Sequence, residues 1–132
     1  MRRMKGATGQ AMAKVLVVDD SSTVRDEVAG FLKKAGLDVA TAVDGKDGLA
    51  KLKADAGIRL IVSDVNMPNM DGLTMVEKIR SELANTAVNV VMLTTESSPA
   101  MKERGKAAGV RGWIVKPFKG EAVLETFRKL AG

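Results

Sequence analysis

Short apolar runs alternate with amphipathic segments along the whole chain. The apolar runs are rich in β-branched residues and predict five strands, at residues 14–18, 38–42, 59–63, 88–93 and 111–115. Near-continuous apolar runs, such as Val15 to Val18, are typical of strands that are covered on both faces. The pattern therefore favours a parallel sheet that lies between layers of helices.

The segments between the apolar runs have apolar residues at helical spacing. Five helices are predicted: one that stops at Gly36, one from Asp44 to near Gly57, one that follows Asp71, one from Ser98 to Gly109, and one from about Lys119 to Leu130. Asp and Ser are favoured N-caps, Pro99 suits the first helical position, and Gly favours the end of a helix. The fourth helix has a thin apolar face, so we expect it to be the least well anchored.

Five strand–helix units in one small domain predict an α/β fold, a three-layer α/β/α doubly wound sandwich with right-handed crossovers. The length of 132 residues suits one domain with one ordinary core. No apolar run approaches the roughly 20 residues that span a bilayer, so we expect no membrane span. The N-terminus lacks the apolar segment of a secretory signal, and we expect a cytoplasmic location.

The residue types that are absent restrict the chemistry of the chain. It has no Cys and no His, which excludes thiolate nucleophiles, disulfides and the commonest general base and transition-metal ligand. Any chemistry must therefore use carboxylates, hydroxyls, lysines and backbone groups.

The net charge of +5 is concentrated at the N-terminus. Four of the 21 basic residues lie within residues 1–14, which have no acidic residue, and the rest of the chain has 17 basic against 16 acidic residues. A domain so close to neutral lacks the basic surface that DNA binding needs, so no direct DNA binding is expected.

We divide the chain into a basic, flexible extension, residues 1–11, and a domain, residues 12–132. The extension is a native segment, a mis-assigned start or an expression remnant.

Polar residues follow the predicted strands where each strand ends, and the carboxyl ends of parallel strands share one rim. Asp19 and Asp20 follow the first strand and Asp64 follows the third. The fourth ends in Thr94, Thr95 and Glu96, and the fifth in Lys116-Pro117. We therefore expect three carboxylates, a hydroxyl and an ammonium group to converge at this rim.

Three neighbouring carboxylates require a counterion. Two carboxylates about 4 Å apart repel by roughly 4 kcal/mol at a surface-like dielectric, and three in one cleft favour protonation or a bound cation. Oxygen ligands without His or Cys select a hard ion, Mg²⁺ or Mn²⁺. Such an ion together with Lys116 would cancel the charges of Asp19, Asp20 and Asp64. The neutralised cleft could accept a phosphoryl group, but it has no obvious proton shuttle.

Four motifs make the sequence similar to a known family. The segments VVDD at 17–20, DVNMPNMDG at 64–72, LTTE at 93–96 and WIVKPF at 113–118 resemble those of the receiver domain of bacterial two-component response regulators, most of all the stand-alone chemotaxis type. The resemblance covers residues 14–131. It implies a flavodoxin-like fold with the strand order 2-1-3-4-5.

The resemblance also implies the roles of the rim residues. Asp64 would take a phosphoryl group from a histidine kinase, and Thr94 and Lys116 would hold phosphoryl oxygens. Mg²⁺ would be bound by Asp20, Asp64 and the backbone carbonyl of Asn66, with Asp19 acting through a water. Asn66 and Glu96 would tune hydrolysis, and the peptide bond between Lys116 and Pro117 would be cis. The protein would thus catalyse its own phosphorylation and dephosphorylation and would not be an enzyme in the usual sense.

The resemblance further implies an output switch. Thr94 and Trp113 would couple phosphorylation to the face formed by the fourth helix, the fifth strand and the fifth helix. Two residues depart from the usual pattern: Trp113 replaces Tyr or Phe, and Thr95 replaces a smaller residue beside the site. Both departures bear on the size and speed of the switch.

The partners implied are a chemotaxis-type histidine kinase, a motor or other protein target, and a phosphatase that removes the phosphoryl group. We expect a monomer without an output domain after the last predicted helix. The sequence leaves open a phosphate sink, a phosphorelay intermediate, or a receiver excised from a larger regulator. A flavodoxin-like cofactor-binding protein shares the architecture, but Asp19 and Asp20 would repel a flavin phosphate.

Overall fold

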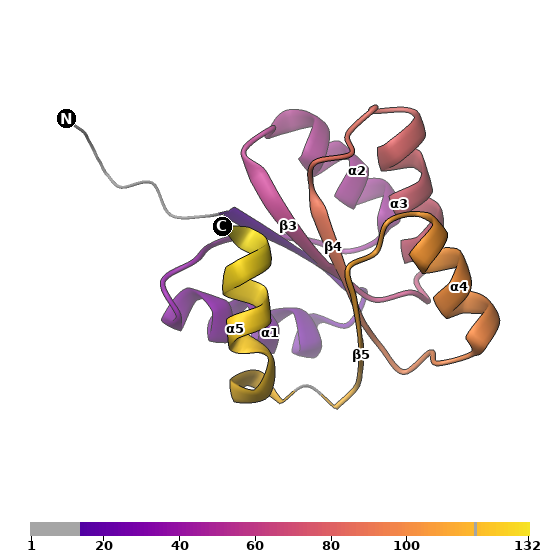
Figure 1. The fold of residues 1–132 in the computed structure, drawn as a ribbon. Helices are drawn as coiled ribbons and strands as arrows, with labels where there is room; N and C mark the ends of the chain where they lie inside the picture. The colour runs from indigo at the N-terminus through magenta and orange to yellow at the C-terminus, as the bar shows by residue number, and fades with distance from the viewer. Residues whose placement is uncertain (1–13, 118) are drawn as a thin grey trace.

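A parallel five-stranded sheet lies between two layers of helices, with α1 and α5 on one face and α2, α3 and α4 on the other (Figure 1). This computed structural model describes residues 14–117 and 119–132, so the predicted extension, residues 1–11, lies outside the described residues. The strands are β1 (Lys14–Val18), β2 (Asp38–Ala42), β3 (Ile58–Ser63), β4 (Asn89–Thr94) and β5 (Gly112–Val115). The helices are α1 (Ser22–Lys34), α2 (Gly45–Ala54), α3 (Gly72–Ser81), α4 (Pro99–Ala107) and α5 (Gly120–Ala131).

The strand order is β2-β1-β3-β4-β5, and every neighbouring pair is parallel. This confirms the predicted doubly wound sandwich and the order that the family resemblance implied. Among the described residues, no helix is both long and apolar enough to cross a bilayer.

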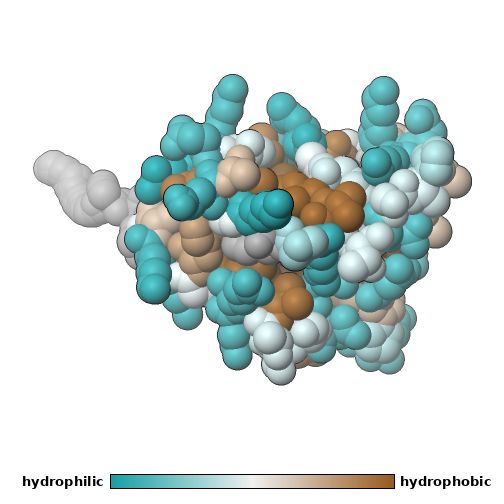
Figure 2. All heavy atoms as spheres, turned by 90° about the horizontal axis from the view of Figure 1, so that it is seen from below, coloured by the Kyte–Doolittle hydropathy of each residue, from teal (hydrophilic) through white to brown (hydrophobic). Residues whose placement is uncertain are grey.

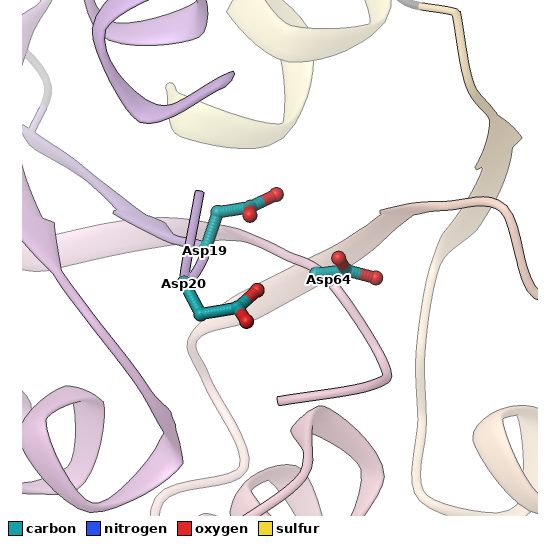
Figure 3. A group of neighbouring side chains, drawn as sticks. All are labelled: Asp19, Asp20 and Asp64. Carbon is teal, nitrogen blue, oxygen red and sulfur yellow. The ribbon is translucent and has the colours of Figure 1, made fainter. Parts of the chain in front are cut away.

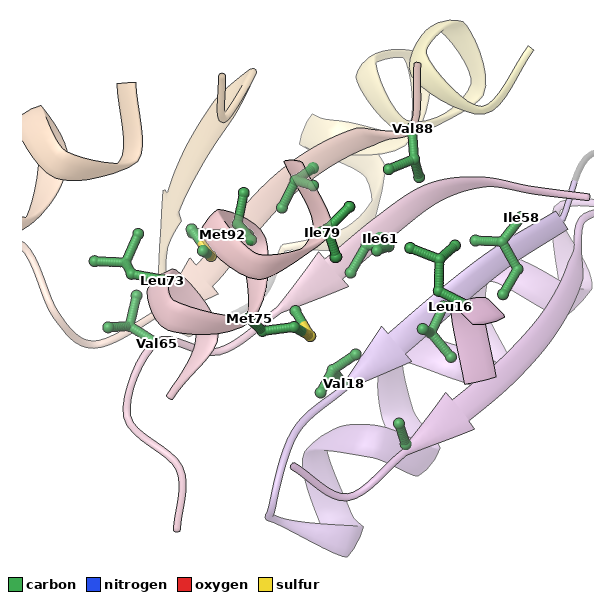
Figure 4. Close-up of a cluster of buried hydrophobic side chains, with 14 residues drawn as sticks. Leu16, Val18, Ile58, Ile61, Val65, Leu73, Met75, Ile79, Val88 and Met92 are labelled. Atoms are coloured by element: carbon green, nitrogen blue, oxygen red, sulfur yellow. The ribbon is translucent and has the colours of Figure 1, made fainter. Parts of the chain in front are cut away.

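The continuous apolar run of β1 arises because its alternate side chains enter two different cores. Val15 and Val17 pack on the α1 and α5 side, where Phe127 is fully buried. Leu16 and Val18 enter the opposite core (Figure 4). Each buried side chain of this size contributes about 1.5–3 kcal/mol to folding. A strand covered on both faces thus fixes the sheet at the centre of the molecule.

Capping residues determine where several of the helices begin and end. The predicted N-caps Asp71 and Ser98, and Asp44 at the predicted start of α2, each accept a hydrogen bond from a backbone N–H in the first turn of their helix. Gly36 and Gly109 follow α1 and α4 with φ of 89° and 82°, the left-handed region in which glycine avoids a steric cost. These predicted helix ends are confirmed.

Other predicted boundaries were wrong by a few residues. The α2 helix ends at Ala54 instead of near Gly57, because Asp55 is extended and its carboxylate accepts hydrogen bonds from Gly57 N and Lys14 Nζ. β3 starts one residue early, at Ile58, and β4 and β5 each start one residue later than predicted. These shifts change neither the order of the elements nor the rim at which the strands end.

The turn after α3 contains a strained residue that can be tested. Ala84 has a φ of 52°, which is costly for a residue with a Cβ, and it is exposed. Ala84→Gly is expected to raise the free energy of unfolding by about 0.5–1 kcal/mol, because relief of strain exceeds the added entropy of the unfolded chain. Urea denaturation measures this, and Gly36→Ala should shift the midpoint in the opposite direction. A lower midpoint for Ala84→Gly would contradict the expectation.

Candidate functional site

Three carboxylates meet at the carboxyl ends of β1 and β3. Asp19 and Asp20 follow β1, Asp64 follows β3, and one carboxylate oxygen of each lies within 4.8 Å of the others (Figure 3). Asp19 and Asp64 are buried, whereas Asp20 is exposed. Since β1 and β3 are neighbours in the sheet, the expected convergence of these residues is present in the structure.

Lys116 is the cation that faces the two buried carboxylates. Its Nζ lies 3.0 Å from Asp19 Oδ2 and 3.0 Å from Asp64 Oδ2. Lys116 follows β5, its backbone N–H donates to Thr94 O, and the Lys116–Pro117 peptide bond is cis. Partial burial lowers the pKa of Lys116, but hydrogen bonds to Asp19 and Asp64 outweigh this effect and raise it overall. The ammonium group is therefore held in its charged form.

The remaining oxygens of the two buried carboxylates are also bonded. Asp19 Oδ1 accepts from Ser21 N at 2.9 Å, and Asp64 Oδ1 accepts from Val65 N at 2.7 Å. By contrast, the Asp20 side chain makes no hydrogen bond or ion pair with any other described residue. The cluster thus has two oriented carboxylates and one that is free to take a ligand.

The donor set fits a divalent hard cation. Three carboxylates and one ammonium have a formal charge of −2, which a single Mg²⁺ or Mn²⁺ would neutralise. All candidate ligand atoms are oxygens, which these ions prefer. Asp20 would offer a carboxylate at the exposed side, where such an ion could keep several waters.

Thr94, Asn66 and Glu96 form a second group at the same rim. Thr94 is fully buried at the end of β4, and its hydroxyl accepts from Glu96 N at 3.1 Å. Asn66 Nδ2 donates to Glu96 Oε1 at 3.4 Å, which joins the segment after β3 to the segment after β4. A hydrogen bond from the Ser98 backbone, followed by that from Asn66, lowers the pKa of Glu96. The structure therefore brings together Asn66 and Glu96, which lie 30 residues apart.

Trp113 joins β5 to both the rim and α4. Its Nε1 donates to Glu96 O at 2.8 Å, two residues after Thr94. A Cβ placed on Gly105 would lie 3.0 Å from Cζ3 of the indole, so the absence of a side chain at Gly105 lets α4 approach the ring. Trp113 is therefore packed under α4 and hydrogen-bonded to the segment that leads into it.

The α4 helix is attached mainly by polar contacts. Gly105 is its only buried residue, which agrees with the thin apolar face seen in the sequence. Arg104 makes two hydrogen bonds to Glu77 of α3, of 2.8 and 2.9 Å, and one to Thr74. Arg80 of α3 donates to the carbonyls of Ala108 and Gly109 after α4. Sequence patterning missed these contacts because they join residues that lie at least 27 positions apart in the chain.

Removing the Arg104 partner should loosen α4. Glu77→Gln is expected to increase hydrogen exchange of α4 amides by up to about fivefold, since a partly exposed ion pair contributes at most about 1 kcal/mol. Hydrogen–deuterium exchange with mass spectrometry measures this directly. Glu82→Gln is the matched control, because Glu82 pairs with Lys78 inside the α3 region and not with α4. If the α4 amides exchange at the same rate in Glu77→Gln and in the wild type, the ion pair between Arg104 and Glu77 does not hold α4 in place.

The surface around the rim is mixed in character. Seen from below, from the end where β4 and β5 finish, it shows apolar patches among hydrophilic side chains (Figure 2). Val43, after β2, and Val115, at the end of β5, are the exposed large apolar residues of the described chain, each with an exposed fraction of 48%. The rim thus offers apolar as well as charged surface to an approaching protein.

Comparison with known proteins gives a consistent result. Residues 15–128 match the response regulator receiver domain. Chemotaxis protein CheY1 of Helicobacter pylori is 38% identical over 120 residues, which cover 90% of this chain and 97% of that protein. Protein PilG of Pseudomonas aeruginosa is 39% identical over 111 residues, which cover 84% of this chain and 82% of that protein. The solved structure of the chemotaxis protein CheY4 of Vibrio cholerae superposes with a TM-score of 0.83 at 46% identity, covering 91% of this chain and 99% of that one.

Proposed function

Because the chain belongs to the response regulator receiver domain family, we propose that it accepts a phosphoryl group on Asp64 from a histidine kinase. Receiver domains are the signalling phosphoproteins of two-component systems. The observation that carries the proposal is the Lys116 ammonium group, which lies 3.0 Å from both Asp19 and Asp64 beside the free carboxylate of Asp20. This arrangement supports the proposal that Asp64 is the nucleophile and that Lys116 and a divalent cation lie beside it.

We assign the divalent cation site to Asp20, Asp64 and the backbone carbonyl of Asn66, with Asp19 acting through a water. When bound, Mg²⁺ or Mn²⁺ supplies positive charge beside the transferring phosphoryl group. The fit of a hard cation to this all-oxygen donor set supports the assignment. Asp19 is held by Ser21 N and Lys116 Nζ and is more deeply buried than Asp64, which suits an indirect role.

The proposed reaction is an in-line displacement at phosphorus. An Asp64 oxygen attacks, the phosphorus–nitrogen bond to the donor histidine breaks, and the electron pair leaves with the imidazole nitrogen. The Val65 N–H and the Lys116 ammonium orient the Asp64 carboxylate, and Lys116 and the Thr94 hydroxyl then hold oxygens of the phosphoryl group. Positioning and charge neutralisation supply most of the catalysis in such transfers.

The product, an acyl phosphate, is open to attack by water, and Asn66 and Glu96 lie at the same rim as Asp64. Their mutual hydrogen bond supports the proposal that they tune the rate of hydrolysis. The protein would thus act on its own phosphoryl group and on no other substrate, with or without the help of a phosphatase.

The proposed output is a shift of α4, β5 and α5 toward a form that binds a target. Phosphorylation would draw the Thr94 hydroxyl toward Asp64 and change the Glu96 segment that accepts the Trp113 hydrogen bond. The phosphoryl group would then bias an existing equilibrium between two packings. By analogy with the chemotaxis relatives, we propose a motor or other motility protein as the target of a cytoplasmic monomer. A phosphate sink or relay is the alternative.

Acceptance of a phosphoryl group tests the proposed function. Incubation with a small phosphodonor and Mg²⁺ should add one phosphoryl group, seen as a single increment in intact mass, and a chelator should prevent it. Deletion of residues 1–11 should leave the reaction unchanged, and a large loss of rate would assign a role to them. A purified protein that is coloured by flavin and takes no phosphoryl group would favour the flavodoxin-like alternative.

The single tryptophan reports the output step. Addition of Mg²⁺ and then of a fluoroberyllate complex, which mimics a phosphoryl group, is expected to shift the emission of Trp113. The physical reason is that the indole hydrogen bond ends on the segment that follows Thr94. Thr94→Ala should remove the shift while leaving Mg²⁺ binding intact. An unchanged spectrum at saturating fluoroberyllate would show that Trp113 does not take part in output.

A further inference from the structure

Residues 65–71, which connect Asp64 to α3, are held by contacts with other elements of the fold. They include Asn66, whose backbone carbonyl we have assigned to the cation site, and Asn66, Pro68 and Asn69 are exposed. Asn69 has a φ of 66°, in the left-handed region. Val65 is buried and Met67 and Met70 pack against the core, so it is the exposed residues of this loop that need contacts with other elements to keep one conformation.

Two hydrogen bonds join this loop to Asp44 and Gly45, at the start of α2. Asn69 Nδ2 donates to Asp44 Oδ2 at 2.8 Å, and Gly45 N donates to Met70 O at 3.0 Å. A Cβ on Gly45 would lie 2.5 Å from Met70 O, so the two backbones approach as closely as glycine allows. The β3–α3 loop and the start of α2 are therefore in direct contact, both through a side-chain hydrogen bond and through their backbones.

Asp44 does more than an N-cap requires. Its Oδ1 accepts from Asp47 N and caps α2, while its Oδ2 holds Asn69. Ser21 and Ser98 cap α1 and α4 with a single hydroxyl oxygen. Asp44 is buried at 8% exposure, and the hydrogen bond from Asn69, ahead of that from Asp47, lowers its pKa. A buried carboxylate with a second oxygen engaged by the loop indicates a role beyond the cap.

We propose that Asp44 and Asn69 form a clamp that fixes residues 65–71, which makes Asp44 a positioning residue for divalent cation binding through the Asn66 carbonyl. This inference rests on the proposed function, in which Asn66 contributes a ligand. Groups that orient the ligands of a metal change its affinity by about 10–100-fold when they are removed. We expect Mg²⁺ affinity to fall by about tenfold when the clamp is broken.

Two variants break the clamp in different ways. Asp44→Ser keeps a side chain that caps α2, as Ser98 does for α4, but it is too short to reach Asn69. Asn69→Gly keeps the Asp44 charge and the left-handed backbone but removes the amide. Each variant should weaken Mg²⁺ binding, measured by calorimetry with MgCl₂, and the double variant should be no worse than either single one. Asp44→Asn should recover part of the affinity, because its amide can still bond to Asn69.

Hydrogen exchange gives a readout that does not depend on the ion. Amides of residues 65–71 should exchange faster in both single variants without Mg²⁺, while amides of α2 remain protected in Asn69→Gly. Ser98→Ala is the matched control, because it removes the cap of α4 and leaves the hydrogen bond between Asn69 and Asp44 in place. It should lower thermal stability and leave Mg²⁺ affinity unchanged.

The outcomes separate this inference from the proposed function. Wild-type protein that binds no Mg²⁺ would overturn the proposed function, and the clamp with it. Wild-type binding with unchanged affinity in Asn69→Gly would overturn the clamp alone, because this variant leaves the α2 cap and all charges in place. Loss of affinity in Asp44→Ser but not in Asn69→Gly would also overturn it, since charge would then be the cause.

Discussion

Asp64→Asn is expected to accept no phosphoryl group under conditions in which the wild type is modified once. The amide has nearly the shape of the carboxylate and can still accept a hydrogen bond from Val65 N, so the fold should persist. It lacks the charged oxygen that attacks phosphorus, and no other described carboxylate faces Lys116 except that of Asp19. Intact mass after treatment with a small phosphodonor and Mg²⁺ measures the effect.

A matched aspartate shows whether the loss is specific. Asp38→Asn changes a carboxylate that faces only Lys14, away from the rim, and should be modified as the wild type is. Continued modification of Asp64→Asn would show that another residue accepts the phosphoryl group.

Lys116→Met is expected to bind Mg²⁺ at least about tenfold more tightly than the wild type, and to lose most of its reactivity with phosphodonors. The ammonium group lies 3.0 Å from two of the carboxylates, so it competes with a cation for them. Charges of +1 and +2 about 6 Å apart repel by roughly 1.4 kcal/mol even at the dielectric constant of water, which is a factor of about ten. Reactivity should fall because a phosphoryl oxygen loses its cationic partner.

Calorimetry with MgCl₂ and intact mass measure the two halves of this prediction. Lys102→Met, on α4, is the control and should change neither the affinity for Mg²⁺ nor the reactivity with phosphodonors. Weaker Mg²⁺ binding by Lys116→Met would contradict the charge competition.

The raised pKa of Lys116 adds a dependence on pH. A cation whose pKa is higher in the folded state contributes stability that is complete below its ordinary value of 10.5. That contribution is lost as the pH rises through the folded-state pKa. The stability of the wild type should therefore fall more steeply above about pH 10.5 than that of Lys116→Met.

Much of the fold was predictable because the strands and caps depend on local sequence. Val15 to Val18 form an unbroken apolar run since β1 is covered on both faces, and Asp71 and Ser98 were identified as caps from their residue type and place. The candidate site was predictable for a topological reason. Strands that run parallel end at one rim, so residues that follow them meet there.

The contacts that were missed depend on how far side chains reach between elements. Arg104 and Glu77 lie 27 residues apart, and nothing in either helix pattern indicates that they pair. The early end of α2 depends on Lys14 reaching Asp55 across 41 residues. The hydrogen bond between Asn69 and the second carboxylate oxygen of Asp44 was also missed. Aspartate before a helix suggests a cap, but the sequence does not show that the β3–α3 loop lies beside it.

The most direct test of the central claim is to locate the phosphoryl group in the wild-type protein. Borohydride reduces an acyl phosphate to an alcohol with release of phosphate, so a phosphorylated aspartate becomes homoserine. Peptide sequencing by mass spectrometry after treatment with phosphodonor, Mg²⁺ and then borohydride identifies the residue. Homoserine at position 64 alone, dependent on both phosphodonor and Mg²⁺, is the predicted result. Homoserine at Asp19 or Asp20, or an unmodified Asp64 in protein that has gained a phosphoryl group, would contradict it.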